Sequence, residues 1–288
     1  MGLFEVFIEY REQFTNYKQV LTHMLLRKYP IRINRRNGHL QTVFNHKQLE
    51  LSRSGFEFSY DPDKQLMIFN FEGKELKLTD ADYNGDLRGV FWYQEYKSLD
   101  VKNHSIIDIG ANIGDSAIYF VLKGAERVIA LEPYPLTYQT FIKNIKLMKL
   151  ENKIEPINAG YGQDSVVLVD KTKRAISSTS LVQSKNGGEP IRLYSIKTLL
   201  ATYDLNNAIL KMDCEGCEYQ ILNEDPKVIT SFEQIMLEYH YGYEQIVDYL
   251  KNLGYSVTFT DPIKSYNANA ENPNMVTGMI FAVRSRSN

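Results

Sequence analysis

The ten residues from 106 to 115, Ile-Ile-Asp-Ile-Gly-Ala-Asn-Ile-Gly-Asp, constrain the fold more than any other part of the chain. A short apolar run ends at Ile109 and contains one acid, Asp108, near its end. A turn containing Gly110 and Gly114 then leads into an apolar, helix-like stretch. Glycine lets a backbone lie close to a ligand where a Cβ would collide. The pattern therefore predicts a strand, a ligand-binding turn and a helix, the alternative being a tight turn without a ligand.

A second acid, Glu132, ends the next apolar run at 127–131. A carboxylate at this place can accept hydrogen bonds from both hydroxyls of a ribose, which a nicotinamide cofactor would also offer. Two details favour S-adenosylmethionine. The residue two positions after Gly110 is Asn112, where the dinucleotide fingerprint G-x-G-x-x-G has its second glycine. Asp108 would repel a pyrophosphate, whereas it suits the positive charge of the sulfonium cofactor.

Short apolar runs alternate with helix-like stretches from residue 105 onward. Helices are expected at 115–123 and 136–148, and the last two runs, 255–260 and 276–283, are expected to form an antiparallel pair. Alternation of this kind predicts βαβ units and a mostly parallel sheet covered on both faces. We therefore expect a doubly wound α/β domain over residues 101–288. The strand candidates are 105–109, 127–131, 153–157, 208–212, 234–237 and 279–283.

The first hundred residues have a different pattern. Residues 3–29 place apolar side chains at helical spacing until Pro30 interrupts them. Residues 56–60 and 67–71 alternate apolar and polar side chains on either side of a turn sequence, which predicts a β-hairpin, and a third strand follows through 76–78. Residues 1–100 are thus predicted to form a smaller α+β region for substrate recognition or oligomerisation.

Four segments, in this order, resemble the FkbM family of methyltransferases. They are DIGANIGDSAIYF at 108–120, VIALEP at 128–133, LKMDCEGCE at 210–218 and EYH at 238–240. The resemblance spans residues 85–260. It implies a Rossmann-like class I methyltransferase fold, S-adenosylmethionine as cofactor, and O-methylation of a hydroxyl on a sugar, a glycan or a small natural product. The implied cofactor-binding residues are Asp108, Gly110, Asn112, Gly114, Ser116, Glu132, Asn158 and Ala159.

Acids and a histidine follow the two strands predicted at 208–212 and 234–237. Asp213, Glu215 and Glu218 follow the first, and Glu238 and His240 end the second. Ligands of open α/β sheets bind outside the carboxyl ends of the strands. Methyl transfer needs an acceptor oxygen that is positioned and deprotonated, while the sulfonium leaves without an acid. We predict catalytic roles for Asp213, Glu215, Glu238 and His240, with His240 as the base and Glu238 orienting it.

Other roles for this group remain open. His240 can instead be a buried, hydrogen-bonded residue, and Glu215 and Glu218 can cap the helix that follows them. Lys211 is expected to pair with one of the acids. Asp213, Glu238 and His240 are chemically suited to a divalent metal, although none is expected. Cys214 and Cys217 form a C-x-x-C pair, and the resembled family usually has apolar residues there. We therefore interpret both cysteines as small buried fillers.

Charge and composition limit the partners. A net charge of −2 argues against a whole-protein field that would hold nucleic acid. Residues 13–49, however, contain no acid and several basic residues. This pattern suggests an anionic partner such as RNA, a nucleotide-linked sugar or a membrane headgroup. The alternative is a solvated helix face or a dimer contact. No transmembrane run or signal peptide is evident, and only two cysteines are present, so a cytoplasmic protein is expected. The basic residues are Lys18, Arg27, Lys28, Arg32, Arg35, Arg36 and Lys47.

Three rival functions remain. The first is an RNA methyltransferase that uses the basic N-terminal segment. The second is a binding protein that keeps the cofactor pocket without catalysis. The third is a nicotinamide-dependent oxidoreductase, which would require NAD to bind in preference to S-adenosylmethionine.

Overall fold

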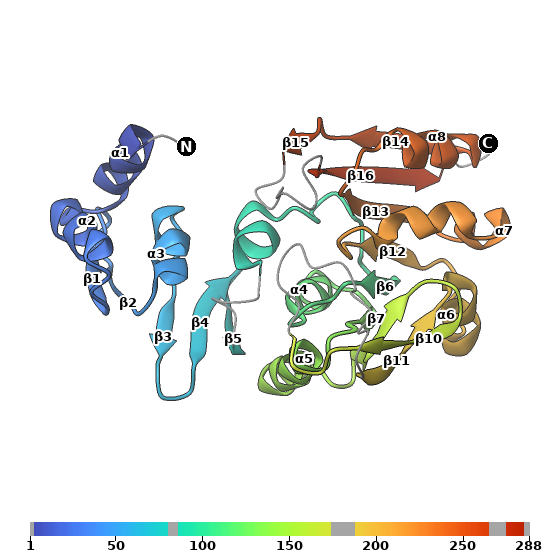
Figure 1. The fold of residues 1–288 in the computed structure, drawn as a ribbon, viewed down its shortest axis with the longest axis horizontal. Helices are drawn as coiled ribbons and strands as arrows, with labels where there is room; N and C mark the ends of the chain where they lie inside the picture. The colour runs from blue at the N-terminus through green and yellow to red at the C-terminus, as the bar shows by residue number, and fades with distance from the viewer. Residues whose placement is uncertain (1–2, 80–85, 174–187, 265–274, 285–288) are drawn as a thin grey trace. The chain divides into compact units, whose positions relative to one another are not determined.

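The computed structural model describes residues 3–79, 86–173, 188–264 and 275–284. The chain divides into two compact units, residues 1–95 and residues 96–288 (Figure 1). Each unit has its own sheets and its own buried apolar side chains.

The first unit combines helices with short antiparallel strands. Strands β3, β4 and β5 form the three-stranded meander that the alternating pattern predicted. The hairpin β1–β2 and the helix α3 were not predicted. The elements are α1 (Leu3–Gln13), α2 (Tyr17–Leu25), β1 (Ile31–Asn34), β2 (Leu40–Val43), α3 (His46–Arg53), β3 (Ser59–Asp61), β4 (Leu66–Phe71), β5 (Lys74–Thr79) and a π-helical turn, η1 (Arg88–Tyr93).

The single helix expected at 3–29 is two helices. Phe14 leaves the helical path and forms an isolated β-bridge with Arg35. The Asn16 side chain accepts a hydrogen bond from the Asn34 backbone N–H and donates one to the Arg32 carbonyl. Apolar periodicity alone did not reveal this break, because contacts with a strand distant in sequence end the first helix.

The second unit is built on one large sheet. Its order is β14-β16-β13-β12-β6-β7-β8, with β15 beside β16. The strands from β13 to β8 are parallel to their neighbours, and β16 is antiparallel to both β13 and β14. The predicted doubly wound sheet and its closing antiparallel pair are confirmed. The strands are β6 (Ser105–Ile109), β7 (Arg127–Leu131), β8 (Ile154–Ile157), β12 (Ile209–Met212), β13 (Gln234–Tyr239), β14 (Tyr255–Phe259), β15 (Ile263–Lys264) and β16 (Val276–Arg284).

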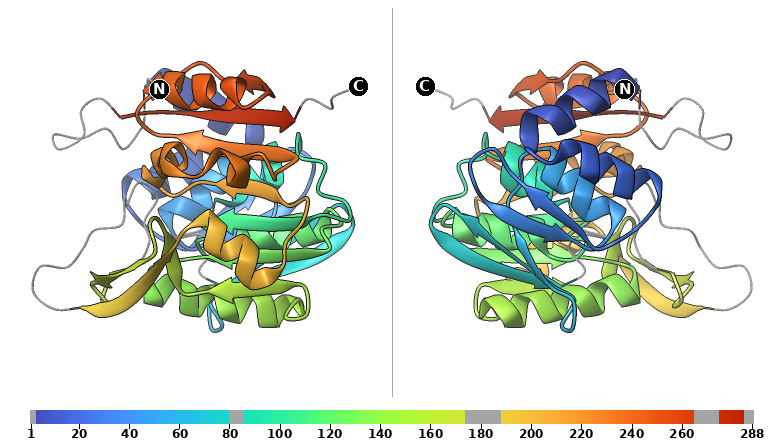
Figure 2. Two further views of the ribbon diagram at one scale, coloured as in Figure 1. Left: turned by 90° about the vertical axis from the view of Figure 1, so that its right-hand side faces the viewer. Right: turned by 90° about the vertical axis from the view of Figure 1, so that its left-hand side faces the viewer.

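Helices cover both faces of this sheet (Figure 1; Figure 2). α4 and α5 lie on one face, and α6, α7 and α8 lie on the other. The apolar strand residues between these layers are almost fully buried, which is why the strands are continuous apolar runs in the sequence. The helices are α4 (Asp115–Leu122), α5 (Pro135–Met148), α6 (Ile196–Tyr203), a 3₁₀ helix η2 (Cys217–Asn223), α7 (Pro226–Ile229) and α8 (Glu244–Asn252).

A small second sheet, which the sequence did not predict, follows β8. It has the order β10-β11-β9. Its strands are β9 (Ala159–Tyr161), β10 (Ser165–Val169) and β11 (Glu189–Tyr194). Much of β10 and β11 is exposed, so neither strand carries a long apolar run.

The order of strands fixes where a ligand can bind. From β6 the chain continues outward to β7 and β8, then returns to β12 on the other side of β6. In doubly wound sheets the crevice at such a reversal, at the carboxyl ends of the strands, is where ligands bind. The predicted cofactor turn follows β6, Asp213 and Glu215 follow β12, Glu238 lies at the end of β13, and His240 follows that strand. None of the helices in the described parts of the chain is long and apolar enough to cross a membrane.

Candidate functional site

The turn after β6 requires glycine for reasons of packing as well as conformation. Gly110 and Gly114 have φ angles of +81° and +88°, in the left-handed region. A Cβ on Gly110 would lie 1.8 Å from the Asp213 carbonyl oxygen, and one on Gly114 would lie 2.1 Å from the Phe141 ring. Asn112 is also left-handed, with φ +48°. The β6 turn therefore packs directly against the loop that follows β12.

Asp108 is fully buried and has two partners. The Ser116 hydroxyl donates a hydrogen bond to its Oδ2 at 2.7 Å, and Lys211 Nζ lies 2.9 Å from its Oδ1. Lys211 also donates to the Gly110 carbonyl at 3.1 Å. These contacts fix the start of α4 and the β6 turn. A contact between Asp108 or Ser116 and the cofactor remains a prediction.

Lys211 does not form the ion pair expected for it. It was predicted to pair with an acid of its own segment, and it pairs with Asp108 instead. The two residues face each other in the parallel register of β12 and β6. Burial by itself would lower the pKa of Lys211, but the charges of Asp108 and Asp213 outweigh it and raise that pKa. Lys211 is thus a buried cation that joins the two strands at the switch point.

Glu132, at the end of β7, is a buried carboxyl group. Burial raises its pKa to about 8, although backbone N–H groups of Tyr134 and Asn112 hydrogen-bond to it. The Asn158 side-chain amide donates to the Glu132 and Pro133 carbonyls at 2.9 and 3.2 Å. Asn158 therefore fixes the turn that presents Glu132. This role is structural. The predicted contact of Asn158 with the cofactor remains a prediction.

Two further residues belong to this neighbourhood. Ala159 begins β9 and is fully buried. Asp115, the first residue of α4, is also buried, and its charge raises the pKa of Glu132. No role was predicted for Asp115 from the sequence, although it directly follows Gly114 and opens α4.

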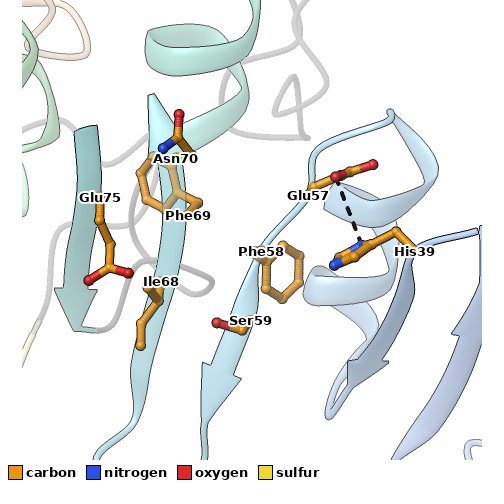
Figure 3. A pocket seen from close by; sticks show the side chains of 8 residues that line it. All are labelled: His39, Glu57, Phe58, Ser59, Ile68, Phe69, Asn70 and Glu75. Carbon is orange, nitrogen blue, oxygen red and sulfur yellow. Dashed lines mark ion pairs between the residues drawn. The ribbon is translucent and has the colours of Figure 1, made fainter. Parts of the chain in front are cut away.

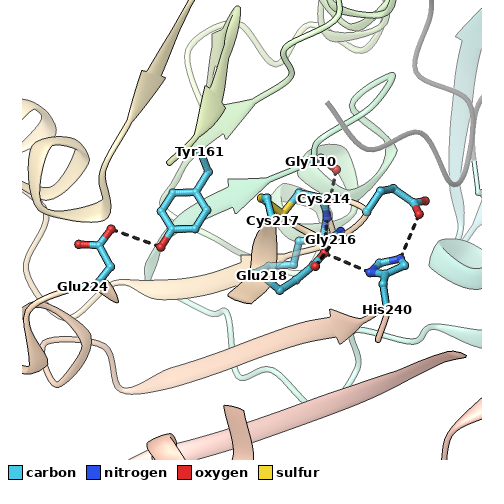
Figure 4. The surroundings of a disulfide bond; sticks show 10 residues. Gly110, Tyr161, Cys214, Gly216, Cys217, Glu218, Glu224 and His240 are labelled. Carbon is cyan, nitrogen blue, oxygen red and sulfur yellow. Dashed lines mark hydrogen bonds and ion pairs between the residues drawn. A yellow bond between two sulfur atoms is a disulfide. The ribbon is translucent and has the colours of Figure 1, made fainter. Parts of the chain in front are cut away.

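A cluster of acids surrounds His240 at the ends of β12 and β13. His240 is 1% exposed. Its Nε2 lies 3.1 Å from Glu215 Oε2. Its Nδ1 lies 3.2 Å from Glu218 Oε1 (Figure 4). Glu238 Oε2 is more distant, 4.0 Å from Nε2. The carboxylates nearest to the imidazole are therefore those of Glu215 and Glu218, whereas the predicted orienting residue was Glu238.

These contacts decide the protonation of His240. Burial alone would lower its pKa, but the hydrogen bonds of Glu215 and Glu218 and the charges of Glu218 and Asp213 raise the pKa to about 12. Burial and the charge of Asp213 raise the pKa of Glu238. At neutral pH the imidazole therefore carries a proton on each nitrogen, and it donates rather than accepts.

The loop between β12 and η2 is closed by a disulfide between Cys214 and Cys217 (Figure 4). Both residues are half-buried and pack against the main core, as expected of small fillers. The expectation that they only fill space was nevertheless wrong, because they are covalently joined. Within the loop, Glu215 and Gly216 both have left-handed φ angles, +58° and +113°.

One group of side chains in the described residues could hold a metal ion. Asp213, Glu218 and His240 offer ligand atoms that all lie within 4.8 Å of one another. The group weighed from the sequence had Glu238 in place of Glu218. Glu218 already accepts hydrogen bonds from the backbone N–H groups of Cys214 and Gly216, both at 2.8 Å.

A separate hollow lies in the first unit, on the β-meander (Figure 3). Its volume is about 290 Å³. The aromatic rings in its wall, Phe58 and Phe69, are only 3% and 4% exposed, so they offer little surface for stacking. The lining residues are His39, Glu57, Phe58, Ser59, Ile68, Phe69, Asn70 and Glu75.

Comparison with known proteins assigns the second unit to a family. Residues 108–257 match the methyltransferase FkbM domain. An uncharacterized protein, 158B of Sulfolobus islandicus rod-shaped virus 1, is 28% identical over 183 residues, which cover 62% of this chain and 89% of that protein.

Solved structures are more distant. TYW2 of M. jannaschii, in complex with AdoMet, has a TM-score of 0.43 and 16% identity, over 86% of this chain and 91% of that one. TrmK of M. capricolum, in complex with S-adenosyl-homocysteine, has a TM-score of 0.43 and 11% identity, over 69% of this chain and 71% of that one. Likenesses at this level give no information about the acceptor.

The family match covers every motif from the β6 turn to His240. It confirms the predicted methyltransferase and, with it, S-adenosylmethionine as the cofactor. The chain belongs to the FkbM methyltransferase domain family.

Proposed function

We propose that this protein transfers a methyl group from S-adenosylmethionine to a hydroxyl on a sugar, a glycan or a small natural product. The observation that carries the proposal is the direct packing of the β6 turn against the β12 loop, where a Cβ on Gly110 would meet Asp213. A cofactor held at the turn lies next to the acids and His240. Cofactor and acceptor therefore share one edge of the sheet.

The residues at the turn fit this cofactor. Glu132 is a buried carboxyl group whose protein partners do not fully compensate its charge, since its pKa is raised to about 8. Two ribose hydroxyls would supply the missing hydrogen bonds. The cofactor brings a methyl group already activated on a sulfonium, so the protein needs only to bind, orient and deprotonate the acceptor.

The cluster at the ends of β12 and β13 would bind the acceptor. The imidazolium of His240 can donate a hydrogen bond to an acceptor oxygen once Nε2 is released from Glu215. Asp213 and Glu238 interact through a hydrogen bond, and the ionised member of this pair can accept the hydroxyl proton. In this proposal the positively charged His240 orients the acceptor. The general base is then the pair of Asp213 and Glu238, whereas the base predicted from the sequence was His240.

Methyl transfer to a panel of glycans and hydroxylated natural products tests the proposal. Asp213→Asn and His240→Gln should lower turnover roughly 10²-fold or more while cofactor affinity is kept. Cofactor binding without transfer to any acceptor would instead favour a binding protein that has lost catalysis.

One observation favours RNA as a second candidate acceptor. Of the seven basic residues at 13–49, Arg35 is buried with Gln41, and Arg36 donates to the Arg11 carbonyl. Arg36 is nevertheless exposed, as are Lys18, Arg27, Lys28, Arg32 and Lys47. Such side chains can neutralise phosphates, and RNA affinity would then fall steeply with salt. RNA binding that is absent, or insensitive to salt, would eliminate this candidate.

A further inference from the structure

We propose that Cys214 and Cys217 are positioning residues for the catalytic cluster, and that reduction of their disulfide releases the cluster from its ordered state. The inference rests on the proposed methyl transfer. It adds that reduction of the disulfide by thiols regulates the same site. It starts from the observation that the disulfide closes a ring of four residues, Cys214 to Cys217, between Asp213 and Glu218.

The ring holds an unfavourable backbone conformation. Glu215 has φ +58°, which costs free energy for any residue with a Cβ, and Gly216 follows with φ +113°. Two left-handed residues in succession turn the chain back, so the Glu215 side chain reaches His240. The Cys214–Cys217 bond restricts the ring to conformations that include this one.

The same ring positions Glu218. Glu218 accepts hydrogen bonds from the N–H groups of Cys214 and Gly216, both of which lie inside the ring. Its Oε1 also lies 3.2 Å from His240 Nδ1. Both carboxylates that contact His240 therefore depend on the ring: one lies in it, and the other is anchored by it.

The remaining surroundings of His240 would stay in place when the ring opens. Glu238 lies on β13, and its Oε2 is 4.0 Å from His240 Nε2. Asp213 precedes the ring and is fixed by its backbone N–H, which donates to the Ile109 carbonyl at 3.0 Å. The Tyr219 hydroxyl accepts from the Tyr241 N–H beyond the histidine. Opening the ring should thus loosen Glu215 and Glu218 selectively, and the imidazole should lose its two nearest anions.

The chemistry is a thiol–disulfide exchange with a dithiol. The dithiol delivers two electrons and two protons, the Cys214–Cys217 bond breaks into two thiols, and the dithiol becomes a cyclic disulfide. Oxidation by the reverse exchange restores the ring. No atom of the acceptor or of the cofactor takes part.

The test follows the surroundings of His240 in the full chain by nuclear magnetic resonance at one fixed pH. The chain has five histidines, so the imidazole signals of protein with ¹⁵N-labelled histidine can be assigned with a His240→Gln variant. In oxidised protein we expect a single sharp set of His240 ring signals, because Glu215 and Glu218 lie against its two nitrogens. After dithiothreitol these signals should shift or broaden, because the two carboxylates are released, while the signals of the other histidines stay unchanged. Reoxidation should restore the His240 signals.

A Cys214→Ser, Cys217→Ser double variant supplies the control. It should give the His240 ring signals of the reduced protein and should not respond to dithiothreitol. Unchanged His240 signals after complete reduction of the wild-type protein, verified by thiol labelling, would overturn the proposal even if the variant does not fold. Two free thiols in oxidised preparations would also overturn it. Calorimetric binding of S-adenosylmethionine, measured on the same samples, tests the proposed function separately.

Discussion

Glu132 is predicted to link cofactor binding to pH through a single buried side chain. Its pKa is raised to about 8 by burial, so it is largely protonated at pH 7 in the free protein. Ribose hydroxyls that donate hydrogen bonds favour the ionised form, and binding must then release the proton. Affinity for S-adenosylmethionine should rise roughly tenfold per pH unit up to about pH 8 and level off above it.

Calorimetry between pH 6 and pH 9, in buffers of different ionisation enthalpy, measures both the affinity and the released proton. Glu132→Gln is the matched control, since its amide keeps the size but does not titrate. It should remove the pH dependence. A wild-type affinity that does not change over this range would show that Glu132 does not bind the cofactor in its ionised form.

Lys211 provides the second test at the scale of the residue. Lys211→Met removes a buried cation and leaves Asp108 buried without its ion pair. Breaking a buried pair from one side costs about 3–5 kcal/mol of unfolding free energy. Lys64, whose ion pair with Asp61 is exposed, offers the control. Chemical denaturation should show a large loss for Lys211→Met and no measurable loss for Lys64→Met, and equal effects would contradict the assigned role.

The partners of individual residues were the least predictable part of the site. That Asp108, Glu132 and His240 lie at the ends of strands followed from apolar runs that end in polar residues. That Lys211 pairs with Asp108 depends on the register between β12 and β6, which the sequence does not specify. That Glu215 contacts His240 depends on a left-handed backbone in a non-glycine residue, which sequence pattern does not predict.

At the scale of elements, the turn after β6 can be tested with a matched pair of glycines. Gly110 and Gly73 have nearly the same φ angle, +81° and +80°. A Cβ on Gly110 would collide with the Asp213 carbonyl at 1.8 Å, whereas a Cβ on Gly73 would meet nothing within 4 Å. Both alanine variants carry the same backbone strain, so their difference measures the close packing of the β6 turn against the β12 loop.

We expect Gly110→Ala to lower both the melting temperature and the affinity for S-adenosylmethionine strongly. Gly73→Ala should lose only about 1 kcal/mol of stability and should bind the cofactor normally. Thermal denaturation and calorimetry of the two variants check this. Similar behaviour of both variants would contradict the idea that close packing at the β6 turn organises the site.

Elements with a clear apolar pattern in the sequence were predictable, and elements without one were not. Strands β6, β7 and β12 are buried on both faces and form continuous apolar runs. Strands β10 and β11 are largely exposed, so they lack such runs. The disulfide had no distinctive signal either, because two cysteines three positions apart fit a turn of buried fillers as well as a bond.

At the scale of the whole molecule, the chain joins a unit of its own architecture, residues 1–95, to a methyltransferase domain. The exposed basic side chains of the first unit are its clearest hint of an anionic partner. The second unit contains every predicted cofactor-binding and catalytic residue. The acceptor is therefore the property least constrained by the fold.

Calorimetric titration of the full chain with S-adenosylmethionine, S-adenosylhomocysteine and NAD tests the central claim most directly. We expect the first two to bind with dissociation constants in the micromolar range, and NAD not to bind. Glu132→Ala should weaken binding of the first two by about 1–3 kcal/mol. Preferential binding of NAD, or no binding of any of the three, would contradict the account of the β6 turn and Glu132 as the cofactor site.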